Sequence, residues 1–250
     1  WLQPTLAHAL QARVAATPLL PAYREFVGKD LPWKQLNWQE AGAAVMSFRC
    51  ALQHSAVGHG DRVGIWLPNS IHAMCMDQAN LQLGAISVPV HTTDNPASIA
   101  YIFDNAEISL LVLSSWGQWE RLRATEYPIA SLRTVVIVDM DGAPPASVSS
   151  AGQPCVVALA DWLQAGEALA QDPAPALPAA SDVAAIVYTS GTTGKPKGVM
   201  LMHSNVMADV RDFVERLQPC SSDRFLSFLP LSHTFERTVG YYLALVSGAC

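Results

Sequence analysis

Hydroxyl groups, glycines and lysines gather in one stretch of the chain, YTSGTTGKPKGVM at residues 188–200. Its hydroxyl, glycine and lysine residues are Thr189, Ser190, Thr192, Thr193, Gly191, Gly194, Gly198, Lys195 and Lys197. Glycines let backbone N–H groups approach an oxyanion closely, hydroxyls add further donors, and lysines add positive charge. An apolar run at 182–189 leads into the stretch as a predicted buried strand. Composition and position therefore predict a loop that binds phosphate.

The spacing of the glycines excludes the Walker A phosphate loop. That motif needs Gly-x-x-x-x-Gly-Lys-Ser/Thr, whereas Thr189 stands five residues before Gly194, and Pro196 follows Lys195. Pro196 also disfavours helical backbone at Lys195, although a Walker A loop runs directly into a helix. We therefore disfavour a P-loop NTPase.

Two other glycine-rich loops also fail to match. The nearest approach to the dinucleotide fingerprint G-x-G-x-x-G is at Gly58 and Gly60, but Val63 stands where the third glycine belongs. This match also precedes a predicted strand instead of following one. A protein-kinase loop needs the same absent spacing, and neither HRD nor DFG occurs in the chain. An ordinary polar loop uses one or two glycines, so the density at 188–200 favours a binding role.

The composition excludes several classes of protein. Hydrophobic residues make up 50% of the chain, yet apolar runs such as 108–113 and 135–138 fall far short of the roughly 20 residues that span a membrane. A net charge of −6 argues against general nucleic-acid binding. The five cysteines form no C-x-x-C pair, and the seven histidines form no metal motif. We expect no disulfide framework, no zinc site and a cytoplasmic location.

Hydrophobic periodicity predicts the elements that must position the loop. Helical spacing indicates helices near 5–17, 37–54, 71–85, 97–105, 118–125, 204–217 and 239–248, with a short helix around Trp162. Short apolar runs indicate strands near 62–66, 86–90, 108–113, 134–139, 182–189 and 224–230. We expect exposed loops at 141–154 and 171–180, and Ser204 as the N-cap of the helix behind the loop. Strands alternating with helices predict an α/β fold, a mostly parallel sheet flanked by helices.

Several motifs together resemble one family. YTSGTTGKPKGV (188–199) resembles the phosphate-binding signature of adenylate-forming enzymes, which include acyl-CoA synthetases, peptide-synthetase adenylation domains and beetle luciferases. GDRVGIWLPNS (60–70), LQLGA (81–85) and ISVPVHTTDNP (86–96) are similar to the early part of that family's large domain. LPLSHTFERT (229–238) resembles the next family motif, in a form most similar to long-chain fatty acyl-CoA synthetases.

The resemblance implies an ATP-dependent activation of a carboxylic acid to an acyl-adenylate, followed by transfer to a thiol, usually that of CoA. The implied cofactor-binding residues are Thr189, Ser190, Gly191, Thr192, Thr193, Gly194, Lys195 and Lys197. Lys195 and His233 are the implied catalytic residues, with His233 beside the acyl carboxylate and the α-phosphate. Thr189 or Thr192 would touch the Mg²⁺ that accompanies ATP, because this ion prefers oxygen ligands and phosphates.

The resemblance also implies that the chain is the N-terminal part of a longer synthetase, inactive alone, because the later family motifs would lie beyond Cys250. The expected organisation has a helical segment at 1–59 that packs on a second subdomain, an α/β subdomain at 60–220, and the start of the truncated second subdomain at 221–250. Fatty acid, ATP and CoA are the expected partners, without nucleic acid.

Other interpretations stay open at this point. The acid could be something other than a long-chain fatty acid, the acceptor could be a carrier protein, and the chain could be a nucleotide-binding module without catalysis. Peripheral membrane contact and the oligomeric state are also open. We expect Glu236 and Arg237 to form a structural ion pair or a solvated face, and Tyr241 and Tyr242 to be core or helix-face aromatics.

Overall fold

The computed structural model describes residues 3–142, 152–189 and 195–250. These residues form a seven-stranded sheet in the order β7-β6-β5-β3-β4-β8-β9 and a separate two-stranded sheet, β1-β2. The strands are β1 (Pro21–Glu25), β2 (Lys34–Asn37), β3 (Arg62–Trp66), β4 (Ile86–Pro89), β5 (Leu110–Ser115), β6 (Thr134–Asp139), β7 (Cys155–Ala158), β8 (Val183–Thr189) and β9 (Lys197–Met202). Neighbouring strands of the large sheet are parallel except β8 and β9. The predicted α/β fold with a mostly parallel sheet is confirmed.

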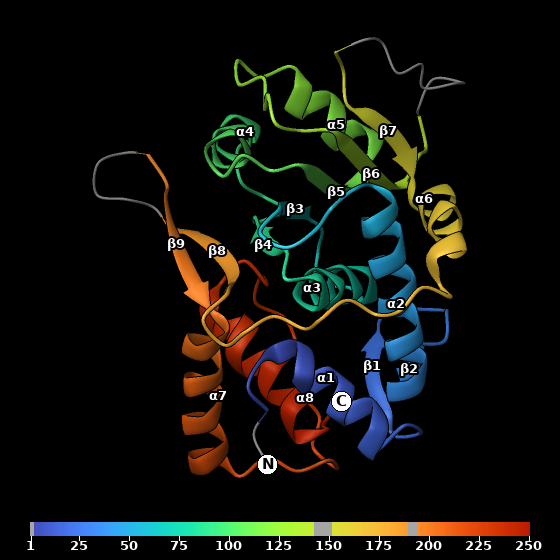
Figure 1. The fold of residues 1–250 in the computed structure, drawn as a ribbon, viewed down its shortest axis with the longest axis vertical. Helices are drawn as coiled ribbons and strands as arrows, with labels where there is room; N and C mark the ends of the chain where they lie inside the picture. The colour runs from blue at the N-terminus through green and yellow to red at the C-terminus, as the bar shows by residue number, and fades with distance from the viewer. Residues whose placement is uncertain (1–2, 143–151, 190–194) are drawn as a thin grey trace.

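Helices cover both faces of the large sheet (Figure 1). The helices are α1 (Leu6–Ala16), α2 (Trp38–His54), α3 (Ile71–Leu83), α4 (Pro96–Asn105), α5 (Trp116–Arg123), α6 (Leu159–Gly166), η1 (Glu167–Leu169), α7 (His203–Leu217), η2 (Glu236–Tyr242) and α8 (Leu243–Ser247). Leu110 and Val112 of β5 pack with α2, α3 and α6, whereas Leu111 and Leu113 pack with α4 and α5. Side chains alternate along a strand, so residues 110–113 are all apolar because both faces of the strand are buried there.

A third group of elements packs beside the sheet, where the two ends of the chain meet (Figure 1). Buried residues of α1, α7, η2 and α8 form one apolar cluster with Met74 and Leu81 of α3. The Arg13 side chain of α1 donates hydrogen bonds to the carbonyl oxygens of Leu245 at 3.2 Å and Val246 at 2.5 Å. The first and last helices are therefore tied together.

The sequence missed four strands. The β1–β2 hairpin, β7 and β9 were not predicted, and β9 is an exposed edge strand whose only strand partner among the described residues is β8. Its apolar residues do not face a core, so their pattern gives no strand signal. The division of the chain at residues 59 and 220 stays a prediction.

Two local predictions were wrong. Residues 224–230 form no strand, and Leu226 and Phe228 are exposed. The described backbone bonds of this segment go to Cys250, to the Asn69 side chain and to the His233 N–H. Helix α7 begins at His203, so Ser204 lies in its first turn and is not the N-cap. Within the described residues, no helix is long and apolar enough to cross a membrane.

Candidate functional site

Two parallel strands end side by side where the chain changes from one face of the sheet to the other. After β3 the chain enters α3 on one face, and after the neighbouring β4 it enters α4 on the opposite face. In open α/β sheets, ligands bind outside the carboxyl ends of the strands. A cavity of about 320 Å³ lies here, lined by Leu67 and Asn69 after β3 and by His91 and Thr92 after β4. The topology marks it as a candidate binding site.

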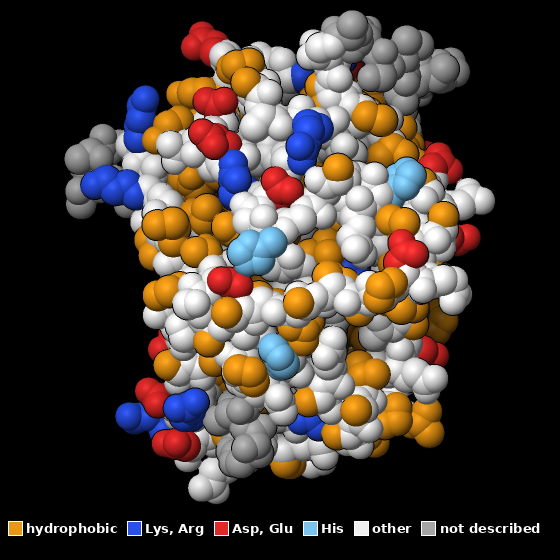
Figure 2. All heavy atoms as spheres, in the orientation of Figure 1, with side chains coloured by type: hydrophobic (Ala, Val, Ile, Leu, Met, Phe, Trp, Pro, Cys, Tyr) orange, Lys and Arg blue, Asp and Glu red, His pale blue; other side chains and the backbone are white. Residues whose placement is uncertain are grey.

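The predicted phosphate loop leaves the sheet from this same edge. Strand β8 is parallel to β4, so Thr189 at its carboxyl end lies at the edge where β4 also ends. Thr189 pairs with Lys197 at the start of β9, and Thr189, Lys195 and Lys197 are all exposed. Lys and Arg side chains project from the left side of the view where these strands end (Figure 2). The predicted site residues Ser190, Gly191, Thr192, Thr193 and Gly194 lie outside the described residues.

Helix α4 contacts the hairpin formed by β8 and β9. The Tyr188 hydroxyl donates a hydrogen bond to Asn105 Oδ1 at 2.8 Å. The Lys195 ammonium lies over the Tyr101 ring, 5.3 Å from its centroid, and Tyr101 packs edge-on against Tyr127. Burial, with a smaller contribution from Tyr101, raises the pKa of Tyr188 to about 12, so this hydroxyl keeps its proton and stays a donor at neutral pH.

His233 occupies the turn that precedes η2. Its backbone N–H donates to the Pro230 carbonyl at 2.9 Å, and its own carbonyl accepts from the Arg237 N–H at 3.0 Å. The imidazole is exposed, whereas the neighbouring Ser232 and Arg237 line the 320 Å³ cavity. Among the described residues, no hydrogen bond, ion pair or ring contact joins the His233 side chain to Thr189, Lys195 or Lys197. His233 thus follows a cavity-lining residue, Ser232, in the chain, and its side chain makes no described contact with the two lysines.

Two members of a buried charged cluster, Asp77 and Arg237, line part of this cavity. Arg237 Nη2 donates to Asp77 Oδ1 at 2.5 Å, and the Tyr242 hydroxyl donates to Asp77 Oδ2 at 2.9 Å. Burial lowers the pKa of Arg237, but the Asp77 carboxylate together with Tyr242 and Tyr241 outweighs this effect and holds that pKa above its ordinary value. Arg237 and Glu236 are 4% and 3% exposed, so they are not a solvated face. The ion pair of Arg237 is with Asp77 and not with Glu236, a partner that sequence reasoning missed.

The helix that carries this cluster has an extra residue in its turn. Residues 236–242 are π-helical. This geometry is rare in proteins, and where it occurs it is often at a functional site. A Cβ added at Gly240 would overlap Glu236 Oε1, so the buried carboxylate sits directly on the Gly240 backbone. Tyr241 accepts a hydrogen bond from Gln78 Nε2 at 2.7 Å, and burial raises the pKa of both Tyr241 and Tyr242. The two tyrosines are buried, as predicted for core aromatics.

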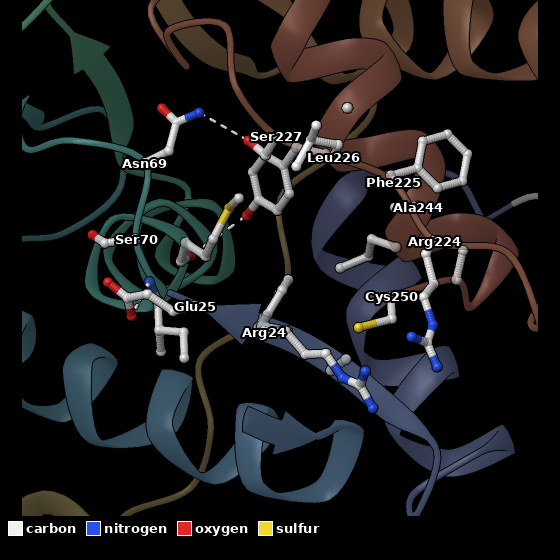
Figure 3. Close-up of a pocket in the computed structure, with 18 of the residues that line it drawn as sticks. Arg24, Glu25, Asn69, Ser70, Arg224, Phe225, Leu226, Ser227, Ala244 and Cys250 are labelled. Atoms are coloured by element: carbon white, nitrogen blue, oxygen red, sulfur yellow. Dashed lines mark hydrogen bonds between the residues drawn. The ribbon is translucent and has the colours of Figure 1, made fainter. Parts of the chain in front are cut away.

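A larger cavity of about 700 Å³ is drawn in Figure 3 and shares lining residues with the first one. It is lined by β1, the start of α3, residues 224–227 and the end of the chain. Asn69, Ser227 and Tyr241 line both cavities. Asn69 Nδ2 donates to Ser227 Oγ at 2.8 Å and to the Leu229 carbonyl at 2.7 Å, and its Oδ1 accepts from the Leu231 N–H at 3.2 Å. Asn69 thus holds the segment that leads to His233.

Comparison with known proteins agrees with this geometry. The family described as AMP-binding enzyme matches residues 10–250. This chain belongs to the AMP-binding enzyme family. The predicted resemblance to adenylate-forming enzymes is confirmed.

Individual members of the AMP-binding family show how much of such a protein this chain represents. Long chain acyl-CoA synthetase 6, peroxisomal, of Arabidopsis thaliana is 33% identical over 206 residues, which cover 82% of this chain and 29% of that protein. Long-chain-fatty-acid–CoA ligase 1 of Homo sapiens is 33% identical over 186 residues, which cover 71% of this chain and 26% of that protein. The chain therefore spans less than a third of these relatives.

A solved structure shares the fold. The long-chain-fatty-acid-CoA ligase FadD1 of Archaeoglobus fulgidus superposes on this chain with a TM-score of 0.79 and 21% identity. The superposition covers 100% of this chain and 46% of that one. At this identity the likeness establishes the fold and nothing finer.

The sequence predicts that either Thr189 or Thr192 contacts the magnesium ion. Thr189 lies exposed at the end of β8, whereas Thr192 lies outside the described residues. No group of three or more His, Cys, Asp or Glu in the described part of the chain could hold a metal ion. Mg²⁺ keeps several waters and takes much of its coordination from substrate phosphates. A single hydroxyl suits an ion that enters with ATP.

Proposed function

We propose that the full-length protein activates a fatty acid, with a long-chain acid as substrate, to its CoA thioester. The observation that supports this proposal is the position of the β8–β9 hairpin in a chain of the AMP-binding family. The hairpin presents Thr189, Lys195 and Lys197 at the carboxyl edge of the sheet, from which the 320 Å³ cavity also opens. A polyanion and an acid could meet at that edge.

The reaction has two balanced steps. A carboxylate oxygen of the fatty acid attacks the α-phosphorus of ATP, and the bond from that phosphorus to the bridging oxygen of pyrophosphate breaks. The thiol sulfur of CoA then attacks the acyl carbonyl carbon, the bond from carbon to the AMP oxygen breaks, and the thiol proton is released. The products are acyl-CoA, AMP and pyrophosphate.

Charge neutralisation is the main task of the protein in the first step. An anionic carboxylate must approach a triphosphate, so fixed positive charges and donors at the reacting centre lower the barrier. Lys195 and Lys197 supply the charge, the Thr189 hydroxyl and the residues at 190–194 supply donors, and Mg²⁺ bound with ATP would supply further charge. These roles stay proposals for each residue.

His233 is proposed to orient the acyl carboxylate. Its exposed imidazole is free to reach a substrate, and the backbone that carries it is anchored on both sides. Asn69 holds the preceding segment through three hydrogen bonds, and the buried Arg237–Asp77 pair holds the following helix. The cavity between these anchors is where we place the reacting acid.

The long-chain assignment is supported by the relatives and by the motif at 229–238. Relatives about 30% identical to this chain are named as long-chain acyl-CoA synthetases or ligases. The 250-residue chain covers only a part of such proteins, and we propose that it does not catalyse the reaction without the remainder.

The test is acid-dependent ATP–pyrophosphate exchange by the full-length protein with saturated acids of C8 to C18. Exchange that depends on a long-chain acid, followed by thioester formation with free CoA, is the expected result. Exchange with none of these acids would overturn the fatty-acid assignment. Thioester formation with a carrier-protein phosphopantetheine and not with CoA would overturn the assigned acceptor.

A further inference from the structure

Helix α4 reaches the β8–β9 hairpin through two side chains on one face. Tyr101 and Asn105 are four residues apart, so they project from the same side of the helix. Asn105 accepts the hydrogen bond of Tyr188 in β8, and the Tyr101 ring faces the Lys195 ammonium, two residues before β9 begins. Helix α4 therefore contacts the hairpin both in β8 and just before β9.

The helix that makes these contacts is firmly attached to the sheet. Asn95 caps its N-terminus by accepting from the Ala97 N–H at 2.9 Å, and Pro96 occupies the first turn. Four of its residues are buried in the core on that face of the sheet: Ile99, Ala100, Ile102 and Phe103. The Tyr101 ring also contacts the edge of the Tyr127 ring, with 5.7 Å between the centroids. Helix α4, which carries the Tyr101 ring, is therefore held firmly against the sheet.

We infer that Tyr101 is a positioning residue for Lys195, and that Asn105 supports the same hairpin through Tyr188. The inference rests on the proposed function, in which Lys195 meets the phosphates of ATP. A lysine side chain has several rotatable bonds, and holding its ammonium on an aromatic face restricts them before the nucleotide arrives. A cation over an aromatic ring at an exposed site is worth about a two- to five-fold change in an equilibrium constant.

The ring, and not the hydroxyl, makes the contact with Lys195. The negative face of the ring attracts the ammonium, so Tyr101→Phe keeps the interaction, and Tyr101→Leu keeps a similar apolar volume but removes it. Tyr127→Leu is the matched control, because it removes a neighbouring ring that packs on Tyr101 without facing Lys195.

The kinetic test measures kcat/KM for ATP in acid-dependent pyrophosphate exchange by the full-length protein. We expect Tyr101→Leu to lower this kcat/KM about two- to five-fold, and Tyr101→Phe and Tyr127→Leu to stay near the wild-type value. In a Lys195→Met background, Tyr101→Leu should cause no further change. An additive effect there, or the same fall in Tyr127→Leu, would show that Tyr101 acts only through packing and would overturn the inference.

A second readout does not depend on ATP. Lysine amines of the full-length protein are converted to ¹³C-dimethylamines, which keep their charge, and the Lys195 signal is assigned by its loss in Lys195→Arg. The ring current of Tyr101 should shift this signal upfield, with the shift kept in Tyr101→Phe and lost in Tyr101→Leu. An unshifted signal overturns the inference and leaves the proposed function standing. A shifted signal in a protein without ATP–pyrophosphate exchange overturns the proposed function, and with it the positioning role.

Discussion

Arg237 and Asp77 form a buried ion pair between residues that are 160 positions apart in the sequence. Both side chains are at most 4% exposed, and Tyr242 joins them by accepting from Arg237 Nη2 and donating to Asp77 Oδ2. The pair connects α3, which follows β3, to η2, which follows His233. It therefore fixes the distance between the sheet edge and the segment that carries the proposed acid-orienting residue.

Removing one partner of this pair should destabilise the protein strongly. Arg237→Met leaves the Asp77 carboxylate buried without its cation, and loss of one partner of a buried pair costs about 3–5 kcal/mol. The matched control is Arg123→Met, because Arg123 and Glu120 form an exposed pair at 3.9 Å, and such pairs contribute about 0–1 kcal/mol. Urea unfolding measures both. Equal losses in the two variants would contradict a structural role for the buried pair.

Gly240 should tolerate no side chain. Gly240→Ala places a methyl group where it would overlap Glu236 Oε1, so the π-helix must shift, at a cost of about 1–3 kcal/mol. Gly117→Ala is the control, because a Cβ there has no heavy atom of the described residues within 4 Å and the residue lies in α5. Alanine in a helix is favoured over glycine by about 0.5–1 kcal/mol. Denaturation midpoints that move equally in both variants would contradict the crowding at Gly240.

His203 should make the folded state sensitive to acid. Burial lowers the pKa of His203 to about 4, against the opposing effects of Asp182 and Asp77, and neither ring nitrogen has a hydrogen-bond partner among the described residues. The unfolded state takes up the proton near pH 6.5 and the folded state only near pH 4, so this contribution to stability is complete above 6.5. It is lost as the pH falls from 6.5 to 4 and amounts to roughly 3 kcal/mol.

Unfolding free energies measured across that pH range check this prediction. In His203→Leu the component that falls between pH 6.5 and 4 should disappear, because no group at this position takes up a proton. Removal of a buried imidazole without partners should cost little at pH 7. An unchanged pH slope in the variant would show that other groups cause the acid sensitivity.

Under the proposed function, replacing Asn69 should change the KM for the fatty acid more than the KM for ATP. Asn69→Ala removes the three hydrogen bonds that hold residues 227–231, each worth about 0.5–1.5 kcal/mol. We expect the KM for the fatty acid to rise about ten-fold and the KM for ATP to stay near its original value. Ser227→Ala removes only one of these bonds and should have a smaller effect. A rise confined to the KM for ATP would contradict the placement of the acid in this cavity.

The central sheet could be predicted because its strands are buried on both faces. The runs at 110–113 and 135–138 are continuously apolar, and each lies in a parallel strand. The exposed strand β9 could not be predicted in this way, because Val199 and Met200 are 45% and 68% exposed and form a strand by pairing with β8. The prediction for residues 224–230 was wrong in the opposite way. Their apolar pattern predicted a strand, but among the described residues this segment pairs with no strand.

Only the part of the candidate site that lies within one short sequence motif could be predicted from the sequence. The residue types and spacing at 188–200 are enough to single out Thr189, Lys195 and Lys197. The partners of these residues could not be found in the same way, because only the fold brings Tyr101 to Lys195 and Asp77 to Arg237. Nothing about α4 or α3 in the sequence distinguishes these residues from ordinary helix positions.

Acid-dependent ATP–pyrophosphate exchange by full-length Lys195→Ala is the most direct test of the central claim that this hairpin binds ATP for acid activation. Loss of a preorganised group that stabilises transition-state charge costs about 10²–10³-fold in kcat, so exchange should fall by about 10²-fold. Lys29→Ala, a change at an exposed lysine between β1 and β2, should leave exchange unchanged. Exchange by Lys195→Ala at the wild-type rate would contradict the account.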